Sequence, residues 1–148
     1  MSKPYVAGVG MIPFTKPGKS DSWDSMGARA AKLALDDAGI DYADVGQAYV
    51  GYVYGDSTCG QSALYEIGLT GVPIVNVNNN CSTGSTPLFL ARQAVESGAV
   101  DVALALGFEQ MNPGALGTTF RDRKGVMGKF APVMLGMQQF EPAVPGAA

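Results

Sequence analysis

Residues 72–91 carry no charged side chain, and their character changes twice along the chain. Residues 72–77 form an apolar run, and residues 78–85 form a polar turn that contains Cys81. Residues 86–91 form a further uncharged segment after this turn. An apolar run without clean alternation is typical of a strand covered on both faces. The stretch therefore predicts a buried strand that turns through three asparagines into a helix, as in a parallel α/β sheet.

The rest of the chain extends this alternation. The patterns predict strands at residues 5–9, 48–54, 72–77 and 100–106, and helices at about 22–38, 61–69 and 83–97. A βαβαβαβ order predicts a parallel α/β domain. The first half of the helix at 83–97 is apolar on every side, which predicts burial all round. We therefore expect Leu88→Asp to bury an unpaired charge and to abolish folding.

Two further features set the organisation of the chain. Gly8 and Gly10 follow the first predicted strand, but Pro13 stands where a dinucleotide-binding loop needs its third glycine, so these glycines are expected to allow close packing and a turn. Beyond residue 107 the periodicity disappears. We predict that residues 1–111 form the α/β part and that residues 112–148 begin an irregular loop or lid region.

Composition excludes several classes of protein. Charged residues make up 16 % of the 148, below the roughly 25 % of globular proteins, so we expect another chain or a missing segment to cover much of the surface. A net charge of −3 argues against a nucleic-acid binder. No apolar run approaches the roughly 20 residues of a membrane span. Two cysteines without histidine predict no metal site and a reducing compartment.

Cys81 is the candidate catalytic residue. Its three preceding asparagines are costly to bury unless they are hydrogen-bonded, and α/β folds place their sites at the carboxyl ends of parallel strands. A cysteine in the first turn of a helix is favoured in its reactive thiolate form. The alternative is a small structural cysteine, which is the preferred interpretation for Cys59.

A basic cluster, opposed only by Asp122, is the candidate binding site for an anionic cofactor. It consists of Arg121, Arg123, Lys124 and Lys129. Guanidinium groups pair well with phosphate oxygens, although a solvated loop has the same composition.

Three stretches resemble the N-terminal half of a thiolase, most closely the thiolase part of sterol carrier protein X. They are residues 50–61 (VGYVYGDSTCGQ), 71–85 (GVPIVNVNNNCSTGS) and 103–111 (ALALGFEQM). The resemblance implies one βαβαβαβ half of a five-layer αβαβα architecture, incomplete in this chain, and a homodimer. It also implies an acyl-CoA thioester as partner, with coenzyme A as a substrate and no bound cofactor.

The resemblance also assigns roles to residues. Cys81 matches the cysteine that takes the acyl group, its backbone N–H matches an oxyanion donor, and the basic cluster falls in the loop region that covers coenzyme A. The catalytic histidine and the second cysteine of thiolases belong to a C-terminal half, which would have to be supplied in cis or in trans.

The predicted function is that of an acyl-CoA acyltransferase, working by thiolysis or Claisen condensation in lipid or sterol side-chain degradation. Without a base, the isolated chain is expected to be inactive. An aldolase-like lyase of the same fold and a non-catalytic partner subunit remain open alternatives. The expected location is the cytoplasm, or the peroxisome in a eukaryote.

Overall fold

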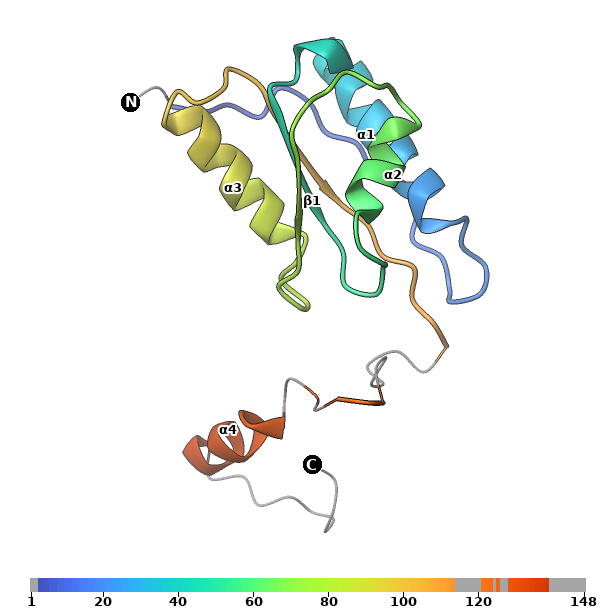
Figure 1. The fold of residues 1–148 in the computed structure, drawn as a ribbon, viewed down its shortest axis with the longest axis vertical. Helices are drawn as coiled ribbons and strands as arrows, with labels where there is room; N and C mark the ends of the chain where they lie inside the picture. The colour runs from blue at the N-terminus through green and yellow to red at the C-terminus, as the bar shows by residue number, and fades with distance from the viewer. Residues whose placement is uncertain (1–2, 114–120, 124, 126–127, 139–148) are drawn as a thin grey trace. The chain divides into compact units, whose positions relative to one another are not determined.

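The computed structural model describes residues 3–113, 121–123, 125 and 128–138, in two compact units, Met1–Pro113 and Gly114–Ala148 (Figure 1). The first unit alternates helices and strands along the chain. Its elements are α1 (Trp23–Ala38), the short 3-10 helix η1 (Tyr42–Asp44), β1 (Gln47–Gly51), α2 (Cys59–Tyr65), β2 (Ile74–Val77), α3 (Ser85–Glu96) and β3 (Ala103–Gly107).

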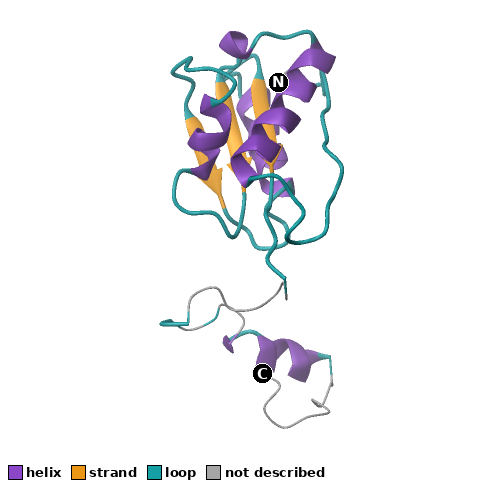
Figure 2. Cartoon of the chain, turned by 90° about the vertical axis from the view of Figure 1, so that its right-hand side faces the viewer, coloured by secondary structure: helices purple, strands orange, loops and turns teal. Residues whose placement is uncertain are grey.

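The three strands form one parallel sheet in the order β2-β1-β3. β1 is central: Ala48 pairs with Ile74 on one side and with Leu104 on the other. Helices α1 and α2 cover one face and α3 covers the other (Figure 1), and Figure 2 shows the strands side by side between helices. The predicted parallel α/β class is confirmed, with three of the four predicted strands present.

The core is built from the central strand outward. Ala48 and Val50 of β1 are fully buried, as is Leu64 of α2, and Leu104 and Leu106 of β3 join them. Helix α1 packs with small residues and ends at Gly39, whose φ of 65° is the left-handed conformation that glycine adopts most easily. The carboxyl ends of the three strands consequently meet at one edge of a firmly packed sheet.

The predicted strand at residues 5–9 is wrong, because this segment pairs with none of the strands that the structure describes. It runs instead along α1. The Val9 N–H donates a hydrogen bond to the carboxylate of Asp37, a residue of that helix (2.9 Å). A Cβ at Gly8 would overlap the backbone of α1 at Ala38, and one at Gly10 would overlap it at Ala34. The two glycines therefore allow the close packing that the sequence predicts, against a helix rather than within a sheet.

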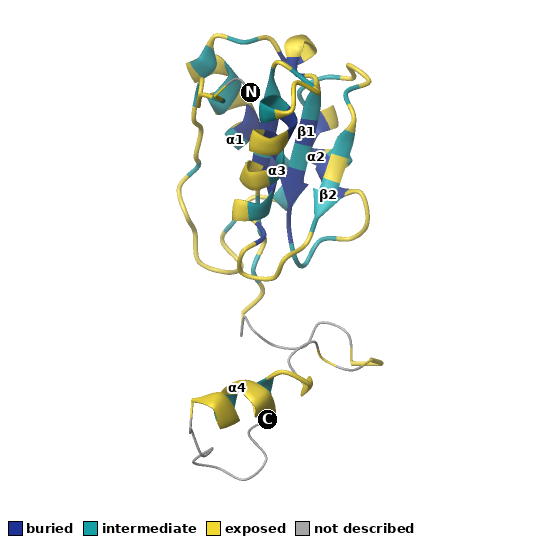
Figure 3. Cartoon of the chain, turned by 90° about the vertical axis from the view of Figure 1, so that its left-hand side faces the viewer, coloured by how far each residue is buried: buried dark blue, intermediate teal, exposed yellow. Residues whose placement is uncertain are grey.

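The predicted burial of the helix at 83–97 on all sides is also wrong within this chain. Pro87, Ala91 and Ala94 of α3 are buried against the sheet. Leu88 and Phe89 are 59 % and 58 % exposed, and Figure 3 shows exposed residues along the outer side of the helix. Apolar residues line both sides, but among the described residues only the sheet provides a surface that covers them.

The second unit contains α4 (Ala131–Met137), a helix that the sequence analysis did not predict. A proline in its first turn is compatible with a helix start, because the missing N–H needs no partner there. Seven residues with glycine near the end give too short a pattern to distinguish helix from loop. Over the described residues, no helix combines the length and the apolar character needed to cross a bilayer.

Candidate active site

Cys81 is exposed and lies between the end of β2 at Val77 and the start of α3 at Ser85. The segment, residues 78–84, is called the Cys81 turn below. Its backbone is closed by hydrogen bonds from the Ser82 N–H to the Asn79 carbonyl and from the Thr83 N–H to the Asn80 carbonyl, both 3.0 Å. The thiol is thus held at the carboxyl edge of the sheet, on a turn with defined backbone geometry.

The asparagines that precede Cys81 bond to the turn itself. The Asn79 N–H donates to Thr83 Oγ1 (2.7 Å) and its side-chain amide to Thr86 Oγ1 (3.1 Å). The Asn80 N–H donates to Asn78 Oδ1 (3.1 Å). Asn80 has a φ of 48°, in the left-handed region that asparagine tolerates better than most residues. The polar residues singled out in the sequence therefore shape the turn around Cys81.

Glycines bring this turn against the strands. A Cβ at Gly51, the last residue of β1, would overlap the carbonyl oxygen of Thr83 and lie 3.0 Å from Pro87 Cγ. A Cβ at Gly107, the last residue of β3, would lie 3.3 Å from the Cα of Gly84. Among the described residues, Thr83 is the one buried polar side chain. The height of Cys81 above the sheet is consequently set by backbone contacts.

The sequence predicts that Cys81 lies in the first turn of the helix, but the structure places it before the helix begins. Because α3 begins at Ser85, the N–H groups at its start are one turn further along the chain. The nearest polar contact of the thiol is a long one, to Asn80 Oδ1 at 3.8 Å. The structure thus supports an accessible cysteine, and it weakens the argument that the helix end activates it.

Glu109 lies at the same edge of the sheet, directly after β3, and the sequence analysis did not single it out. Its carboxylate accepts hydrogen bonds from the N–H groups of Val53 (2.8 Å) and Tyr54 (3.3 Å), which tie the loop after β1 to the end of β3. The neighbouring Phe108 stacks on Tyr52 and on Trp23, with ring centroids 5.5 and 5.8 Å apart. A carboxylate directly after a predicted strand, at the edge where α/β sites form, was the signal.

Asn76 is a second missed residue, and it connects β2 to α2. Its Oδ1 accepts from the Gly60 N–H (2.8 Å), and its Nδ2 donates to Gln61 Oε1 (2.6 Å). Asn76 therefore satisfies a free N–H group at the start of α2. An amide inside an otherwise apolar run requires such partners, and this was the available signal.

Cys59 is buried, 2 % exposed, at the start of α2, as its structural interpretation predicts. Burial raises the pKa of the Cys59 thiol above its usual value, and a hydrogen bond with the backbone of Asp56 offsets part of the rise. At any given pH below that pKa, less thiolate is present than in a free cysteine.

We expect iodoacetamide at mildly alkaline pH to modify native Cys81 and to spare Cys59, because only Cys81 is reachable and Cys59 is both covered and less ionised. Intact-mass measurement should show a single adduct on the native chain, none on native Cys81→Ser, and two adducts after unfolding in denaturant. Equal labelling of both cysteines in the native chain would show that α2 does not protect Cys59.

The basic cluster belongs to the second unit. Arg121, Arg123 and Lys129 are exposed, and Lys124 lies outside the described residues. Arg123 forms an ion pair with Asp122 (2.9 Å), which lowers the pKa of that carboxyl and raises the pKa of the guanidinium. The described part of the chain contains no group of three or more His, Cys, Asp or Glu side chains arranged to hold a metal ion.

An apolar hollow of about 380 Å³ lies at the carboxyl end of β3, on the face that α1 covers. Its lining includes Met11, Ile12, Phe14, Met26, Phe108 and Met111. A second hollow lies at the opposite edge of the sheet, far along the strands from the Cys81 turn. The first hollow lies at the same edge of the sheet as Cys81, and its lining includes no residue of the Cys81 turn.

Comparison with known proteins agrees with this geometry. The family model for the N-terminal domain of thiolase matches residues 5–131. Sterol carrier protein 2 of Oryctolagus cuniculus is 54 % identical over 134 residues, which cover 88 % of this chain and 24 % of that protein. The benzoylsuccinyl-CoA thiolase subunit BbsB of Thauera aromatica is 39 % identical over 110 residues, covering 72 % and 28 %.

Solved structures share the fold. The 3-oxoacyl-acyl-carrier-protein synthase III of Aquifex aeolicus VF5 superposes with a TM-score of 0.58 at 20 % identity, over 64 % of this chain and 32 % of that one. The chain spans about a quarter of the length of the sterol carrier relatives that it matches. The chain belongs to the thiolase family, of which it carries the N-terminal domain.

Proposed function

We propose that this chain is the nucleophile-bearing part of an acyl-CoA acyltransferase, with Cys81 as the acyl acceptor. The observation that carries the proposal is the placement of Cys81: an exposed thiol on a backbone-defined turn, at the carboxyl edge of the sheet, in a thiolase-family domain. Relatives whose names specify thiolase or acetyl-CoA acetyltransferase activity support an acyl-transfer chemistry.

The proposed step is a thioester exchange. Cys81 Sγ attacks the carbonyl carbon of an acyl-CoA thioester, a new carbon–sulfur bond forms, and the bond to the coenzyme A sulfur breaks. The thiol proton of Cys81 passes through a base to the departing thiolate, so no oxidant or reductant is needed. Transfer of the acyl group to coenzyme A completes thiolysis, and transfer to a carbon nucleophile is a Claisen condensation.

The base and the proton donor are proposed to come from a C-terminal half, in cis or in trans. The 148 residues contain no histidine, and Cys59 is buried with a raised pKa. The remaining proposals follow the resemblance: a homodimer, a role in lipid or sterol side-chain degradation, and a cytoplasmic or peroxisomal location. The basic cluster is proposed to contact coenzyme A phosphates, since Arg121 and Lys129 are exposed and cationic.

The experiment is intact-mass analysis of the longer protein that contains this chain, after incubation with an acyl-CoA. We expect a mass increase of one acyl group that maps to Cys81, and no increase in Cys81→Ser. The matched control is Cys59→Ser, which should still form the adduct. In steady-state assays of the same proteins, Cys81→Ala should lower thiolysis by about a thousandfold or more, as loss of a nucleophile does.

Two outcomes would contradict the proposal. Full activity of Cys81→Ala would favour the aldolase-like lyase, which needs no acyl-cysteine. The 148 residues contain no histidine, from which we infer that the base lies elsewhere. Steady turnover of an acyl-CoA by these residues alone would contradict that inference, because they would then supply the base themselves.

A further inference from the structure

Thr83 closes the chain around Cys81 through its hydroxyl group. Its Oγ1 accepts a hydrogen bond from the Asn79 N–H at 2.7 Å. Asn79 lies two residues before Cys81 and Thr83 lies two residues after it. The bond therefore closes residues 79–83 into a ring of the chain, with Cys81 at the middle position of the segment.

The same residue fixes this ring on the sheet. Thr83 is 5 % exposed and packs on the end of β1. A Cβ at Gly51 would overlap the Thr83 carbonyl oxygen and lie 2.7 Å from its methyl carbon Cγ2. Thr83 thus joins two anchors: its carbonyl and methyl groups rest on β1, and its hydroxyl holds the first half of the Cys81 turn.

Asn79 is held by two further bonds, which differ from the first in their surroundings. The Asn79 carbonyl accepts from the Ser82 N–H (3.0 Å), and its side-chain amide donates to Thr86 Oγ1 (3.1 Å) in an exposed position. The bond to Thr83 is shorter and partly buried. Because a hydrogen bond is electrostatically stronger away from water, the Thr83 hydroxyl contributes most to holding Asn79 among its two side-chain partners.

The position of the sulfur atom depends on this main-chain ring. Among the described residues, the Cys81 thiol itself makes one long contact, to Asn80 Oδ1 at 3.8 Å. Attack on a thioester requires Sγ about 3–3.5 Å from the carbonyl carbon in the correct direction, and a misplacement of about 1 Å costs about a hundredfold in rate. A change that loosens residues 79–83 is therefore expected to slow the attack while leaving the thiol exposed.

We infer that Thr83 is a positioning residue for acyl transfer, whose hydroxyl holds Cys81 Sγ in the direction of the thioester carbonyl carbon. This inference rests on the function proposed for Cys81. Thr83 acts through the main chain of the ring, so it takes no part in bond making or proton transfer. Its loss should lower the rate of the acylation step and not the affinity for the acyl-CoA.

The test uses the longer protein that contains this chain and the rate at which an acyl-CoA forms the Cys81 adduct, followed by intact mass over a range of acyl-CoA concentrations. Thr83→Val keeps the shape without the acceptor, and Thr83→Ser keeps the acceptor. At saturation we expect Thr83→Val to react about tenfold more slowly, with the half-saturating concentration unchanged within about twofold. Thr83→Ser should restore most of the rate.

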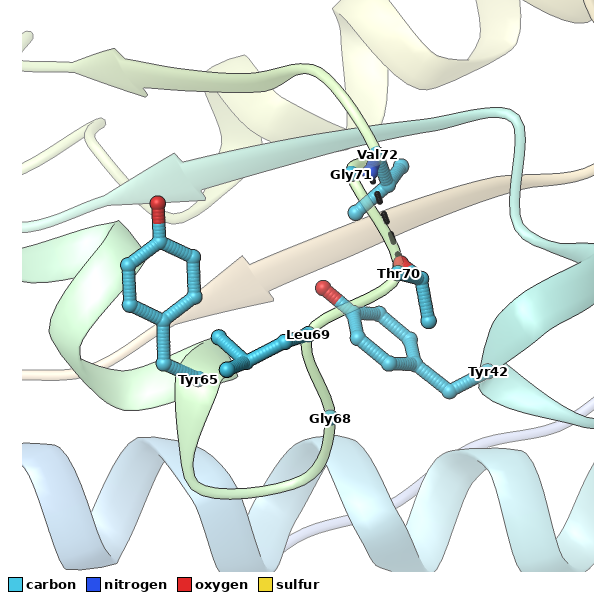
Figure 4. Close-up of a pocket in the computed structure, with 7 residues that line it drawn as sticks. All are labelled: Tyr42, Tyr65, Gly68, Leu69, Thr70, Gly71 and Val72. Atoms are coloured by element: carbon cyan, nitrogen blue, oxygen red, sulfur yellow. Dashed lines mark hydrogen bonds between the residues drawn. The ribbon is translucent and has the colours of Figure 1, made fainter.

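Iodoacetamide provides a readout that needs no alignment with a bound substrate. Its rate of Cys81 alkylation should stay within about twofold of the parent in Thr83→Val, because the thiol remains exposed. The matched control is Thr70→Val, the same chemical change at the opposite edge of the sheet. The Thr70 hydroxyl accepts from the Val72 N–H at 3.4 Å (Figure 4), and its loss should change neither rate.

The possible failures can be told apart. If the parent protein forms no adduct, the proposed function is wrong and this inference falls with it. If the parent forms the adduct and Thr83→Val reacts as fast, or if Thr83→Ser is as slow as Thr83→Val, the inference alone is overturned. If Thr83→Val does not fold, Thr83→Ser and Thr83→Ala differ by the same hydroxyl, and equal acylation rates for these two variants would overturn it.

Discussion

Replacement of Ala91 by aspartate is expected to abolish folding of this chain, whereas aspartate at Leu88 on the same helix is expected to be tolerated. Ala91 is 6 % exposed, on the side of α3 that packs against β1 and β3. A carboxylate there has no cationic partner and would cost several kcal/mol, a large share of the roughly 5–15 kcal/mol that stabilises a domain. Leu88 is 59 % exposed, and an acidic side chain near a helix start is favourable.

Circular dichroism and chemical denaturation of the two purified variants provide the measurement. Ala91→Asp should lack a cooperative unfolding transition, and Leu88→Asp should keep one close to that of the parent. This reverses the expectation from the sequence, in which Leu88→Asp is the disruptive change. An unfolded Leu88→Asp would mean that a surface absent from the described chain, such as that of a second copy, already covers the outer side of α3.

Gly51→Ala is expected to have the second-largest effect, by displacing the Cys81 turn. The added methyl group would overlap the carbonyl oxygen of Thr83 and press on Pro87, and neither can retreat without moving α3. Overpacking of this kind costs about 1–3 kcal/mol and sometimes more. We expect a loss of about 3 kcal/mol in the free energy of unfolding, and a changed rate of Cys81 alkylation in the folded protein.

Gly84→Ala is the matched control for this prediction. Gly84 lies in the same turn, has φ −68° and ψ −32°, and an added Cβ would meet no described atom within 4 Å. Alanine adopts this conformation readily, so the variant should be as stable as the parent or more stable by about 0.4–1 kcal/mol. Equal unfolding free energies for Gly51→Ala and Gly84→Ala would show that the turn does not rest on β1.

The alternation of strands and helices could be predicted because its signals are local. Apolar runs mark β1, β2 and β3, and Gly39 ends α1 wherever the helix packs. The segment at residues 5–9 could not be predicted in this way, because a strand exists only beside a partner, and this segment lies on α1 instead. Likewise, the apolar residues around Leu88 indicate a helix side that is unfavourable in water, but they do not indicate which surface covers that side.

The same distinction applies to the site. The polar turn around Cys81 could be predicted because the residues that shape it are neighbours in sequence. Glu109 bonds to backbone groups 55 and 56 positions earlier, and Asn76 bonds to groups 15 and 16 positions earlier. Such pairings are decided by the register of a parallel sheet, which no local pattern contains.

The contact of Gly51 with Thr83, and of Gly107 with Gly84, has a consequence for interpreting variants at position 81. Backbone contacts and the hydrogen bonds of the neighbouring residues locate the Cα of Cys81 without using its side chain, and among the described residues its thiol makes one long contact, to Asn80 Oδ1. A side chain of similar size can therefore be exchanged there without altering the scaffold. Differences in reactivity between cysteine and serine at this position would measure the intrinsic nucleophilicity of sulfur against oxygen, free of repositioning.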